Sequence, residues 1–318
     1  MTNIENISIT QPILCTTAAI DEFRGELNAT NGNEKLTSNE DALLQSIAHI
    51  KSKAERDGYY NLLSEITARY DRYELDETTV NEFHKILLSG TSADESEKGH
   101  YKQQLNPVYS YTPEGHQIDI FYETASPFET PQMTCELYEW TRKSLKNINC
   151  HPLLTIALFM LRFLIIHPFH DGNSRIARAL TMFLLLKSGY AHLRFASLES
   201  AIENNKEEYY RCLRLAQEQA KQHTPDFSPW LLFFLRTVQR MQKQLRHLLL
   251  KTPAAETLPP LSAKIIEFAA TQNGITLKQT VEYTKANINT VKKHLASLTS
   301  EGLLIRRGSS RGSWYTLK

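Results

Sequence analysis

Residues 153–178 read LLTIALFMLRFLIIHPFHDGNSRIAR, and they say more about the fold than any other part of the chain. The apolar run over 153–166 contains Arg162 and is too short to span a bilayer, so together with Pro152 it predicts a buried helix over 152–166. A polar loop leads from it into a second apolar helix over 174–188. Joining two core helices needs only a short turn. The His, Asp, Asn and Arg side chains of this loop therefore point to a chemical function.

Helical spacing of apolar residues continues on both sides of this pair. Between about Asp41 and Leu88 the apolar residues recur at helical intervals, and the turn-rich Ser89–Gly99 segment predicts a loop. Downstream, the same spacing predicts further helices over 134–146, 206–221 and 229–250. The fold class is therefore mainly α.

One β-hairpin interrupts the helices. Two strand-like runs, 107–111 and 118–122, flank the turn residues Pro113, Glu114 and Gly115. A single hairpin in a helical protein suggests a specific task.

Composition describes an ordinary globular protein. The 318 residues are 41% hydrophobic and 22% charged, and the four cysteines form no CxxC pair that would indicate a zinc site or a disulfide framework. The N-terminus has no basic segment leading into an apolar stretch, so we expect a cytoplasmic protein with no membrane partner.

The start of the second helix can hold an anion. Its free backbone N–H groups and positive dipole end follow Gly172, which lets a ligand approach the backbone closely. Arg175 and Arg178 are three residues apart on one helix face, so both guanidinium groups can reach the same polyanion. A triphosphate fits this arrangement.

Two further residues of the loop suggest catalysis. Asp171 adjoins the anion site, where a carboxylate would repel phosphate unless a divalent cation lies between them, so we expect Asp171 to bind Mg²⁺. His167 can accept a proton from a hydroxyl near neutral pH and is the candidate base. We expect His151, His170 and His192 to be structural or solvent-exposed.

The order H-x-F-x-D-G-N-x-R-x-x-R over His167–Arg178 resembles the signature of the Fic family. The resemblance implies a protein adenylyltransferase that moves AMP from Mg-ATP to a Ser, Thr or Tyr hydroxyl of a target protein or of itself. It makes His167 the base, Phe169 a core anchor and Asp171 the metal ligand. Nucleotide binding falls to Asp171, Gly172, Asn173, Ser174, Arg175, Ile176, Ala177 and Arg178. Ser174 stands where the family usually has glycine, but its backbone N–H remains available.

Two other parts of the chain are similar to Fic proteins. The hairpin is similar to the family's flap, which pairs with an extended target segment. Tyr209, Tyr210 and Gln217 are similar to residues on the nucleoside side, although one of the two tyrosines could serve only in packing.

The segment Thr30–Lys35 is similar to the family's inhibitory pattern S/T-x-x-x-E-G/N. The resemblance implies that Glu34 pairs with Arg178 and blocks the γ-phosphate contact. Lys35 departs from the pattern, and Gly32 weakens a helix, so an ordinary surface loop is the alternative.

The C-terminal end is basic. Residues 261–318 contain nine Lys or Arg and three acidic residues, which leaves a net charge of +6 there and −5 in the rest. Three short helices and a hairpin resemble a winged helix-turn-helix. In DNA-binding members the third helix enters the major groove, which would bring Asn289, Thr290, Lys292, Lys293 and, on the wing, Arg311 to DNA. A protein-interaction or dimerisation module is the alternative.

These interpretations predict four parts: an N-terminal helical segment with the possible inhibitory motif over 1–95, a Fic catalytic core over 96–250, a linker over 251–260 and a winged helix over 261–318. A homodimer is possible. Two other functions stay open: a DNA-binding regulator whose Fic domain is a sensor, and an enzyme that transfers another phosphate-containing group.

Overall fold

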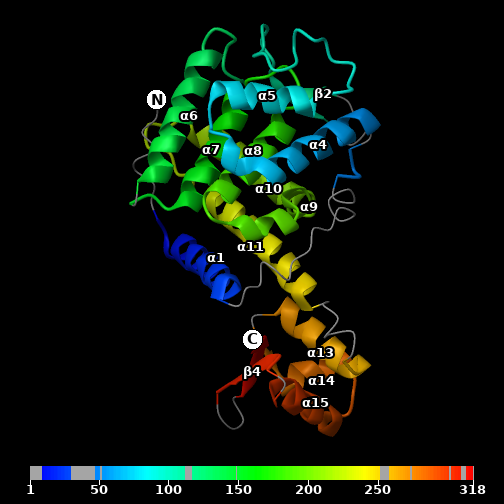
Figure 1. The fold of residues 1–318 in the computed structure, drawn as a ribbon. Helices are drawn as coiled ribbons and strands as arrows, with labels where there is room; N and C mark the ends of the chain where they lie inside the picture. The colour runs from blue at the N-terminus through cyan, green and yellow to red at the C-terminus, as the bar shows by residue number, and fades with distance from the viewer. Residues whose placement is uncertain are drawn as a thin grey trace. The chain divides into compact units, whose positions relative to one another are not determined.

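The computed structural model describes residues 9–29, 47–50, 52–111, 117–147, 149–250, 258–272, 274–300, 302–308 and 313–317. The chain divides into two compact units. Figure 1 shows the chain coloured from blue at the N-terminus to red at the C-terminus. The first contains Met1–Leu27 and Ser38–Met241, and the second contains Asn28–Thr37 and Gln242–Lys318.

The core of the first unit is the helical pair α7 (Pro152–Ile166) and α8 (Asn173–Lys187), which pack against each other. Every residue of α7 is buried except Pro152 and Arg162, so this helix is apolar on all sides. Pro152 occupies the first turn, where a missing N–H costs nothing. The loop between the two helices is thus held on the most buried scaffold of the unit.

Other helices cover this pair. α6 (Thr130–Lys146) and α10 (Lys206–Gln219) contact α7, while α4 (Lys53–Arg69) and α5 (Glu77–Leu87) contact α8. The remaining described helices of this unit are α1 (Gln11–Ala29), η2 (Tyr70–Arg72), η3 (Ala191–Phe195), α9 (Leu198–Glu203) and α11 (Ser228–Leu250). Of these, α1 and α11 extend past the unit boundaries at Leu27 and Met241.

The predicted hairpin is present. Strands β1 (Val108–Tyr111) and β2 (Gln117–Tyr122) pair antiparallel, with register shifts after Val108 and after Ser110. β2 also contacts α10. The turn residues 113–115 lie outside the described part of the chain.

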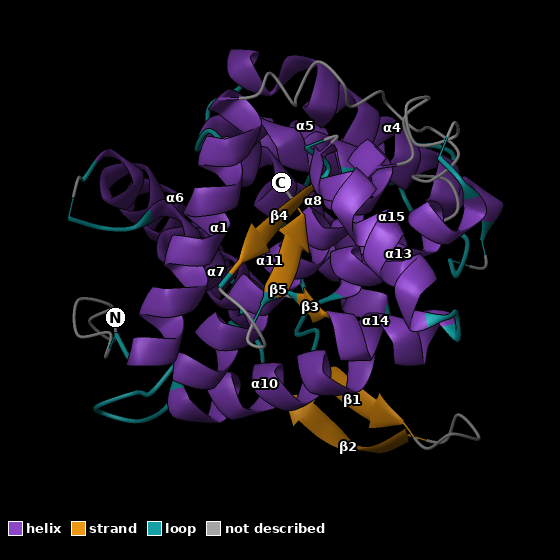
Figure 2. Cartoon of the chain, turned by 90° about the horizontal axis from the view of Figure 1, so that it is seen from below, coloured by secondary structure: helices purple, strands orange, loops and turns teal. Residues whose placement is uncertain are grey.

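Within the described residues, the second unit contains three complete helices and a small sheet. The helices are α13 (Pro260–Thr271), α14 (Leu277–Thr284) and α15 (Ile288–Ser300). The strands β3 (Ile275–Thr276), β4 (Leu304–Arg307) and β5 (Trp314–Leu317) form an antiparallel sheet in the order β3-β5-β4, drawn in orange in Figure 2. Ile265, Val291, Leu295 and Leu298 are among the residues of its own hydrophobic core.

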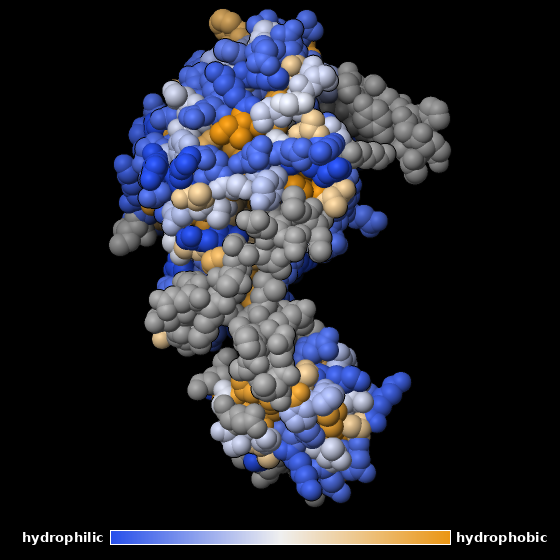
Figure 3. Space-filling model, turned by 45° about the vertical axis from the view of Figure 1, so that its right-hand side comes forward, coloured by the Kyte–Doolittle hydropathy of each residue, from blue (hydrophilic) through white to orange (hydrophobic). Residues whose placement is uncertain are grey.

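Most helix boundaries agree with the sequence prediction. The bounds of α7 are those predicted, whereas α6 begins four residues earlier than expected, because Pro131 fits into its first turn. The visible surface in Figure 3 is mostly hydrophilic, and none of the described helices is long and apolar enough to cross a membrane.

Candidate active site

The loop between α7 and α8 begins with a left-handed turn at His167. Its φ is 52°, an uncommon value for a residue other than glycine, and its N–H donates to the carbonyl of Phe163 at 2.9 Å. This turn ends α7 and redirects the chain. The next apolar side chain, Phe169, is fully buried and stacks on the ring of His84 at 3.8 Å, which agrees with its predicted role as an anchor.

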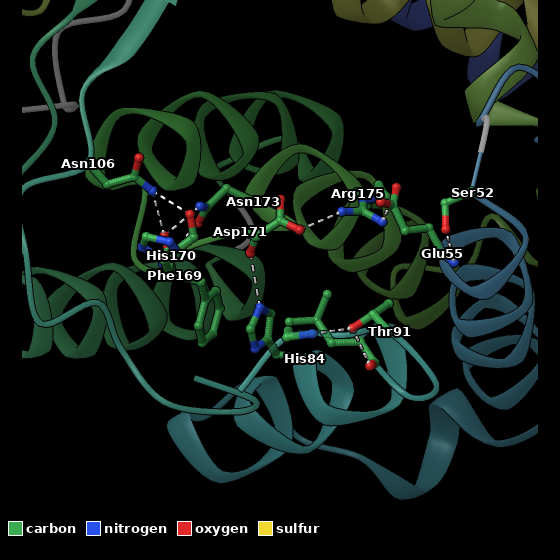
Figure 4. A network of polar contacts seen from close by, with 12 residues as sticks. Ser52, Glu55, His84, Thr91, Asn106, Phe169, His170, Asp171, Asn173 and Arg175 are labelled. Atoms are coloured by element: carbon green, nitrogen blue, oxygen red, sulfur yellow. Dashed lines mark hydrogen bonds and ion pairs between the residues drawn. The ribbon is translucent and has the colours of Figure 1, made fainter. Parts of the chain in front are cut away.

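Asn173 holds the loop closed. Its buried side chain accepts a hydrogen bond from the N–H of Phe169 at 2.9 Å and donates to the carbonyl of the same residue at 2.7 Å. Asn106 donates to the carbonyls of Phe169 and His170 from the other side, as Figure 4 shows. The side chain of Asn173 thus shapes the loop, and its backbone begins α8.

His84 fixes the loop from α5. Its Nδ1 accepts the N–H of Gly99 at 2.9 Å, and its Nε2 lies 3.1 Å from the carbonyl of Asp171 (Figure 4). These partners define a neutral imidazole that carries its proton on Nε2. Burial lowers the pKa of His84 to about 4, which agrees with that tautomer.

Gly172 precedes α8 with a φ of 77°, the left-handed region that glycine adopts without strain. A Cβ atom at this position would lie 3.0 Å from Cδ2 of Leu87. The glycine therefore lets the loop approach α5 closely. The first N–H groups of a helix are in general suited to bind an anion.

Arg175 and Arg178 both line a cavity of about 310 Å³ in front of this helix start. Each already has a carboxylate partner. Arg175 binds Glu55 at 2.9 Å and Asp171 at 3.1 Å, and Arg178 binds Glu199. The protein's own carboxylates thus bind both of the guanidinium groups that an anion in this cavity would contact.

Glu199 lies on α9 at the centre of a buried polar cluster. Its side chain is 4% exposed, and it accepts a hydrogen bond from Tyr59 at 3.0 Å and approaches His49 at 3.2 Å. Burial alone would lower the pKa of Arg178, but the facing carboxylate raises it above its usual value, so the pair is ionised.

Aromatic residues of α10 form one wall of the cavity. Tyr209 is buried, whereas Tyr210 is half-exposed, and both line the space. Tyr209 also packs 6.0 Å from the ring of Trp230, whose Nε1 donates to the carbonyl of Ala157 at 2.7 Å. Gln217 is buried further along α10 and does not line the cavity.

The structure thus brings part of the predicted set together. The cavity is lined by Ser174, Arg175, Arg178, Tyr209 and Tyr210, while Ile176 and Ala177 point their side chains into the core. Glu34 and Arg311 lie outside the described residues.

Sequence reasoning missed several residues of the site. Glu55, Glu199, Glu203 and Lys206 also line the cavity, and Tyr59 contacts it through Glu199. Glu199 belongs to a helix of six residues, which is too short to show an apolar period, so no pattern in the sequence marks it.

The imidazole of His167 is held in its neutral form. Burial lowers the pKa of His167 to about 4, and the nearby ammonium of Lys102 acts in the same direction. The imidazole is therefore neutral at physiological pH and can accept a proton.

Among the side chains of this loop, the carboxylate of Asp171 is of the ligand type that Mg²⁺ takes. Within the part of the chain that is described, no three His, Cys, Asp or Glu side chains form a ready metal cage. Mg²⁺ usually takes only one or two carboxylates and completes its shell with phosphates and water. The carboxylate of Asp171, 60% exposed beside the start of α8, fits that role.

In the second unit, Asn289, Thr290, Lys292 and Lys293 are all exposed on α15. The buried residues Val291, Leu295 and Leu298 occupy the other face of this helix. The predicted DNA-contacting side chains of α15 therefore share a solvent-facing surface.

Comparison with known proteins finds a family model that matches part of the chain. Residues 74–185 match the model of the Fic/DOC family. This matched segment contains the whole loop from His167 to Arg178.

Two named relatives match in sequence. A stretch of 94 residues is 31% identical to a probable protein adenylyltransferase of Aquifex aeolicus, and 147 residues are 25% identical to the protein adenylyltransferase Fic of Drosophila grimshawi. These matches cover 30% and 46% of this chain. The chain spans only 26% of the length of each relative.

Solved structures agree in fold. A Fic family protein from Desulfovibrio desulfuricans G20 is 19% identical, with a TM-score of 0.57 over 98% of this chain and 97% of that one. A Fic domain containing signaling protein from Bacteroides thetaiotaomicron VPI-5482 is 22% identical, with a TM-score of 0.50 over 78% and 97%. The chain thus has the mainly helical Fic fold, with a small antiparallel sheet near the C-terminus.

Proposed function

We propose that the chain is a protein adenylyltransferase that transfers AMP from Mg-ATP to a Ser, Thr or Tyr hydroxyl of a target protein or of itself. The observation that carries this proposal is the cavity lined by Ser174, Arg175 and Arg178 of α8, with the neutral, half-buried His167 at the other end of the loop that precedes this helix. The relatives named as protein adenylyltransferases support the same reaction.

The roles follow from the chemistry of each side chain. His167 takes the proton from the acceptor hydroxyl, whose oxygen forms a bond to the α-phosphorus of ATP. The bond from that phosphorus to the bridging oxygen breaks, and pyrophosphate leaves. Arg175 and Arg178 balance its charge, and Mg²⁺ bound through Asp171 would neutralise more of it.

The two arginines must exchange partners for this to happen. The carboxylates Glu55 and Glu199 hold Arg175 and Arg178 in the present arrangement. Two arginines on one helix face still favour a polyanion such as a triphosphate over a single phosphate group.

Incubation with nucleotides labelled in the transferred group tests the proposal. We expect label from ATP to appear on protein in a Mg²⁺-dependent reaction. His167→Ala should keep ATP binding, because the phosphate-binding groups lie elsewhere, and should lower transfer by about 10²-fold or more. If label is transferred from a different phosphate-containing donor and none from ATP, the group that the enzyme transfers is that donor's group and not AMP. Undiminished transfer by His167→Ala would refute its role as the base.

A second candidate function is DNA binding by the C-terminal unit. It is supported by the exposed polar and basic surface of α15 and by the order of three helices and a β3-β5-β4 sheet, which suits a winged helix. Binding of the full chain to duplex DNA should then fall steeply with salt, and Lys292→Ala or Lys293→Ala should weaken it for all sequences. Absence of binding even at low salt would favour a protein-interaction module.

A further inference from the structure

Lys102 is a buried lysine that bonds to the chain on both sides of His167. Lys102 as a whole is only 3% exposed to solvent. Its Nζ donates to the carbonyl of Ile166 at 3.0 Å, and its backbone N–H donates to the carbonyl of Pro168 at 2.9 Å. One residue therefore binds the carbonyls of the two residues on either side of the candidate base, Ile166 and Pro168.

The position between these two bonds is the strained one. A residue other than glycine at a φ near 52° costs on the order of 1–3 kcal/mol and persists only when its surroundings hold it. The carbonyls of residues 166 and 168 are fixed by Lys102, so the backbone of His167 cannot relax without breaking one of those bonds.

The contact also joins the loop to the flap. Lys102 precedes β1, and its Nζ donates at 2.9 Å to Thr124, which follows β2. Thr124 in turn donates to the carbonyl of Asn106, the residue whose side chain binds the loop at Phe169 and His170. The two ends of the hairpin are thus tied to the loop through one hydrogen-bonded group.

We propose that Lys102 is a positioning residue for His167, holding the left-handed turn from both sides and placing a positive charge beside the imidazole. This inference rests on the proposed function only for the consequence to catalysis, since the contact itself exists in the folded chain. Lys102 does not touch the cavity that would hold the nucleotide.

The charge has a defined direction of effect. Burial lowers the pKa of Lys102 to about 8, so the group is still mainly protonated at neutral pH. The ammonium group of Lys102 disfavours protonation of the His167 imidazole, whereas Asp171 and the carbonyl of Leu164 favour it. His84, packed on the loop from α5, is neutral, and Arg175 is neutralised by its two carboxylates.

Histidine-ring NMR on the full chain tests the contact without any assay of activity. The resonance of His167 is assigned by its loss in His167→Ala. In Lys102→Met we expect the pKa of His167 to rise by about one unit or more. The control Lys143→Met, an exposed lysine on α6, should leave it unchanged. An unchanged titration in folded Lys102→Met would overturn the proposal.

Kinetics at pH 7 test the positioning itself. The imidazole of His167 is neutral at that pH in both proteins, so a change in its pKa does not alter the rate. Because Lys102→Met removes the bond that positions His167, it should lower kcat roughly tenfold or more with little change in the KM for ATP. Lys102→Arg, which keeps the charge and the donors, should recover most of the rate. A loss confined to KM, or no recovery by Lys102→Arg, would contradict a positioning role.

Two outcomes keep the inference separate from the proposed function. If the wild-type chain transfers no AMP, the proposed function fails, while the titration of His167 still decides whether Lys102 acts on it. If Lys102→Met does not fold, Lys102→Gln removes the charge but keeps a donor, and it must raise the pKa of His167 in the same direction. A Gln variant with the wild-type titration would refute the electrostatic effect.

Discussion

Glu199 holds Arg178 in a buried ion pair, so any anion that binds Arg178 has to compete with this carboxylate. Contacts with Tyr59 and His49 fix the carboxylate of Glu199 in its position facing Arg178. A buried charge without its partner is costly, and the arginine therefore always needs one counter-charge, from the protein or from a ligand.

Glu199→Gln should tighten ATP binding. The amide keeps the shape and can still accept the hydrogen bond from Tyr59, but it no longer neutralises Arg178. We expect the affinity for Mg-ATP to rise about tenfold, which corresponds to about 1.4 kcal/mol, because the phosphate no longer displaces a carboxylate. Titration calorimetry measures this change.

The matched control is Glu203→Gln. This residue lines the same cavity but pairs with Lys206 at 2.9 Å. It should leave ATP affinity nearly unchanged. Equal affinities in wild type and Glu199→Gln would show that the ion pair does not oppose the nucleotide.

The segment Thr30–Lys35, which precedes α4 in the sequence, contains a second carboxylate that would compete with ATP for Arg178. If Glu34 reaches Arg178 as the family pattern suggests, Glu34→Gly should raise self-labelling at least roughly tenfold, since about 1.4 kcal/mol corresponds to tenfold. Adding Arg178→Ala should abolish the gain, because the γ-phosphate would lose its ligand. Unchanged labelling by folded Glu34→Gly would make Thr30–Lys35 an ordinary loop.

The junction between the loop and α8 depends on one backbone conformation. Gly172→Ala would place a Cβ in the left-handed region at a cost of about 1–2 kcal/mol and crowd Leu87. We expect a lower unfolding temperature and weaker ATP binding, measured by thermal shift with and without Mg-ATP.

Gly189→Ala provides the comparison. Its φ is 86°, but its added Cβ would meet only Arg24 at 3.8 Å, away from the cavity. The two variants should lose similar stability, while only Gly172→Ala should lose affinity for ATP. If both bind ATP like wild type, the start of α8 is not the phosphate site.

At the scale of the whole molecule, buried neutral histidines make stability depend on pH. The pKa of His84 is about 4 in the folded chain and about 6.5 when unfolded, so the unfolded state takes up the proton first as pH falls. Stability is then constant above pH 6.5 and is lost between pH 6.5 and 4. His192, also buried, acts in the same direction.

Urea unfolding at pH 7.5 and 5.0 measures this loss. His84→Gln cannot take up the proton, so its decrease in stability between these pH values should be smaller than that of wild type by about 2 kcal/mol. His170→Gln, which changes an exposed histidine, should behave like wild type. The same decrease in all three proteins would mean that His84 does not control acid stability.

The sequence allowed the helical core and the chemical loop to be predicted, because both have strong local signals. The run over 152–166 is apolar enough to define α7, and a turn motif between two apolar helices defines the loop. The short elements α9, η3 and β3 have no such period, and the carboxylates that bind the arginines come from distant positions. Ion pairs between α8 and α4 or α9 depend on packing that no local pattern encodes.

Trp230 gives the first unit an internal optical reporter. Its ring is fully buried, its Nε1 is bonded to a main-chain carbonyl, and it lies against Tyr209 in the wall of the cavity. Trp314, in the second unit, is exposed to water. A dissolved quencher such as iodide will therefore extinguish the emission of Trp314 and leave that of Trp230. In a Trp140→Phe background, which removes the third, half-buried tryptophan, occupancy next to Tyr209 can then be followed by fluorescence without attaching a dye.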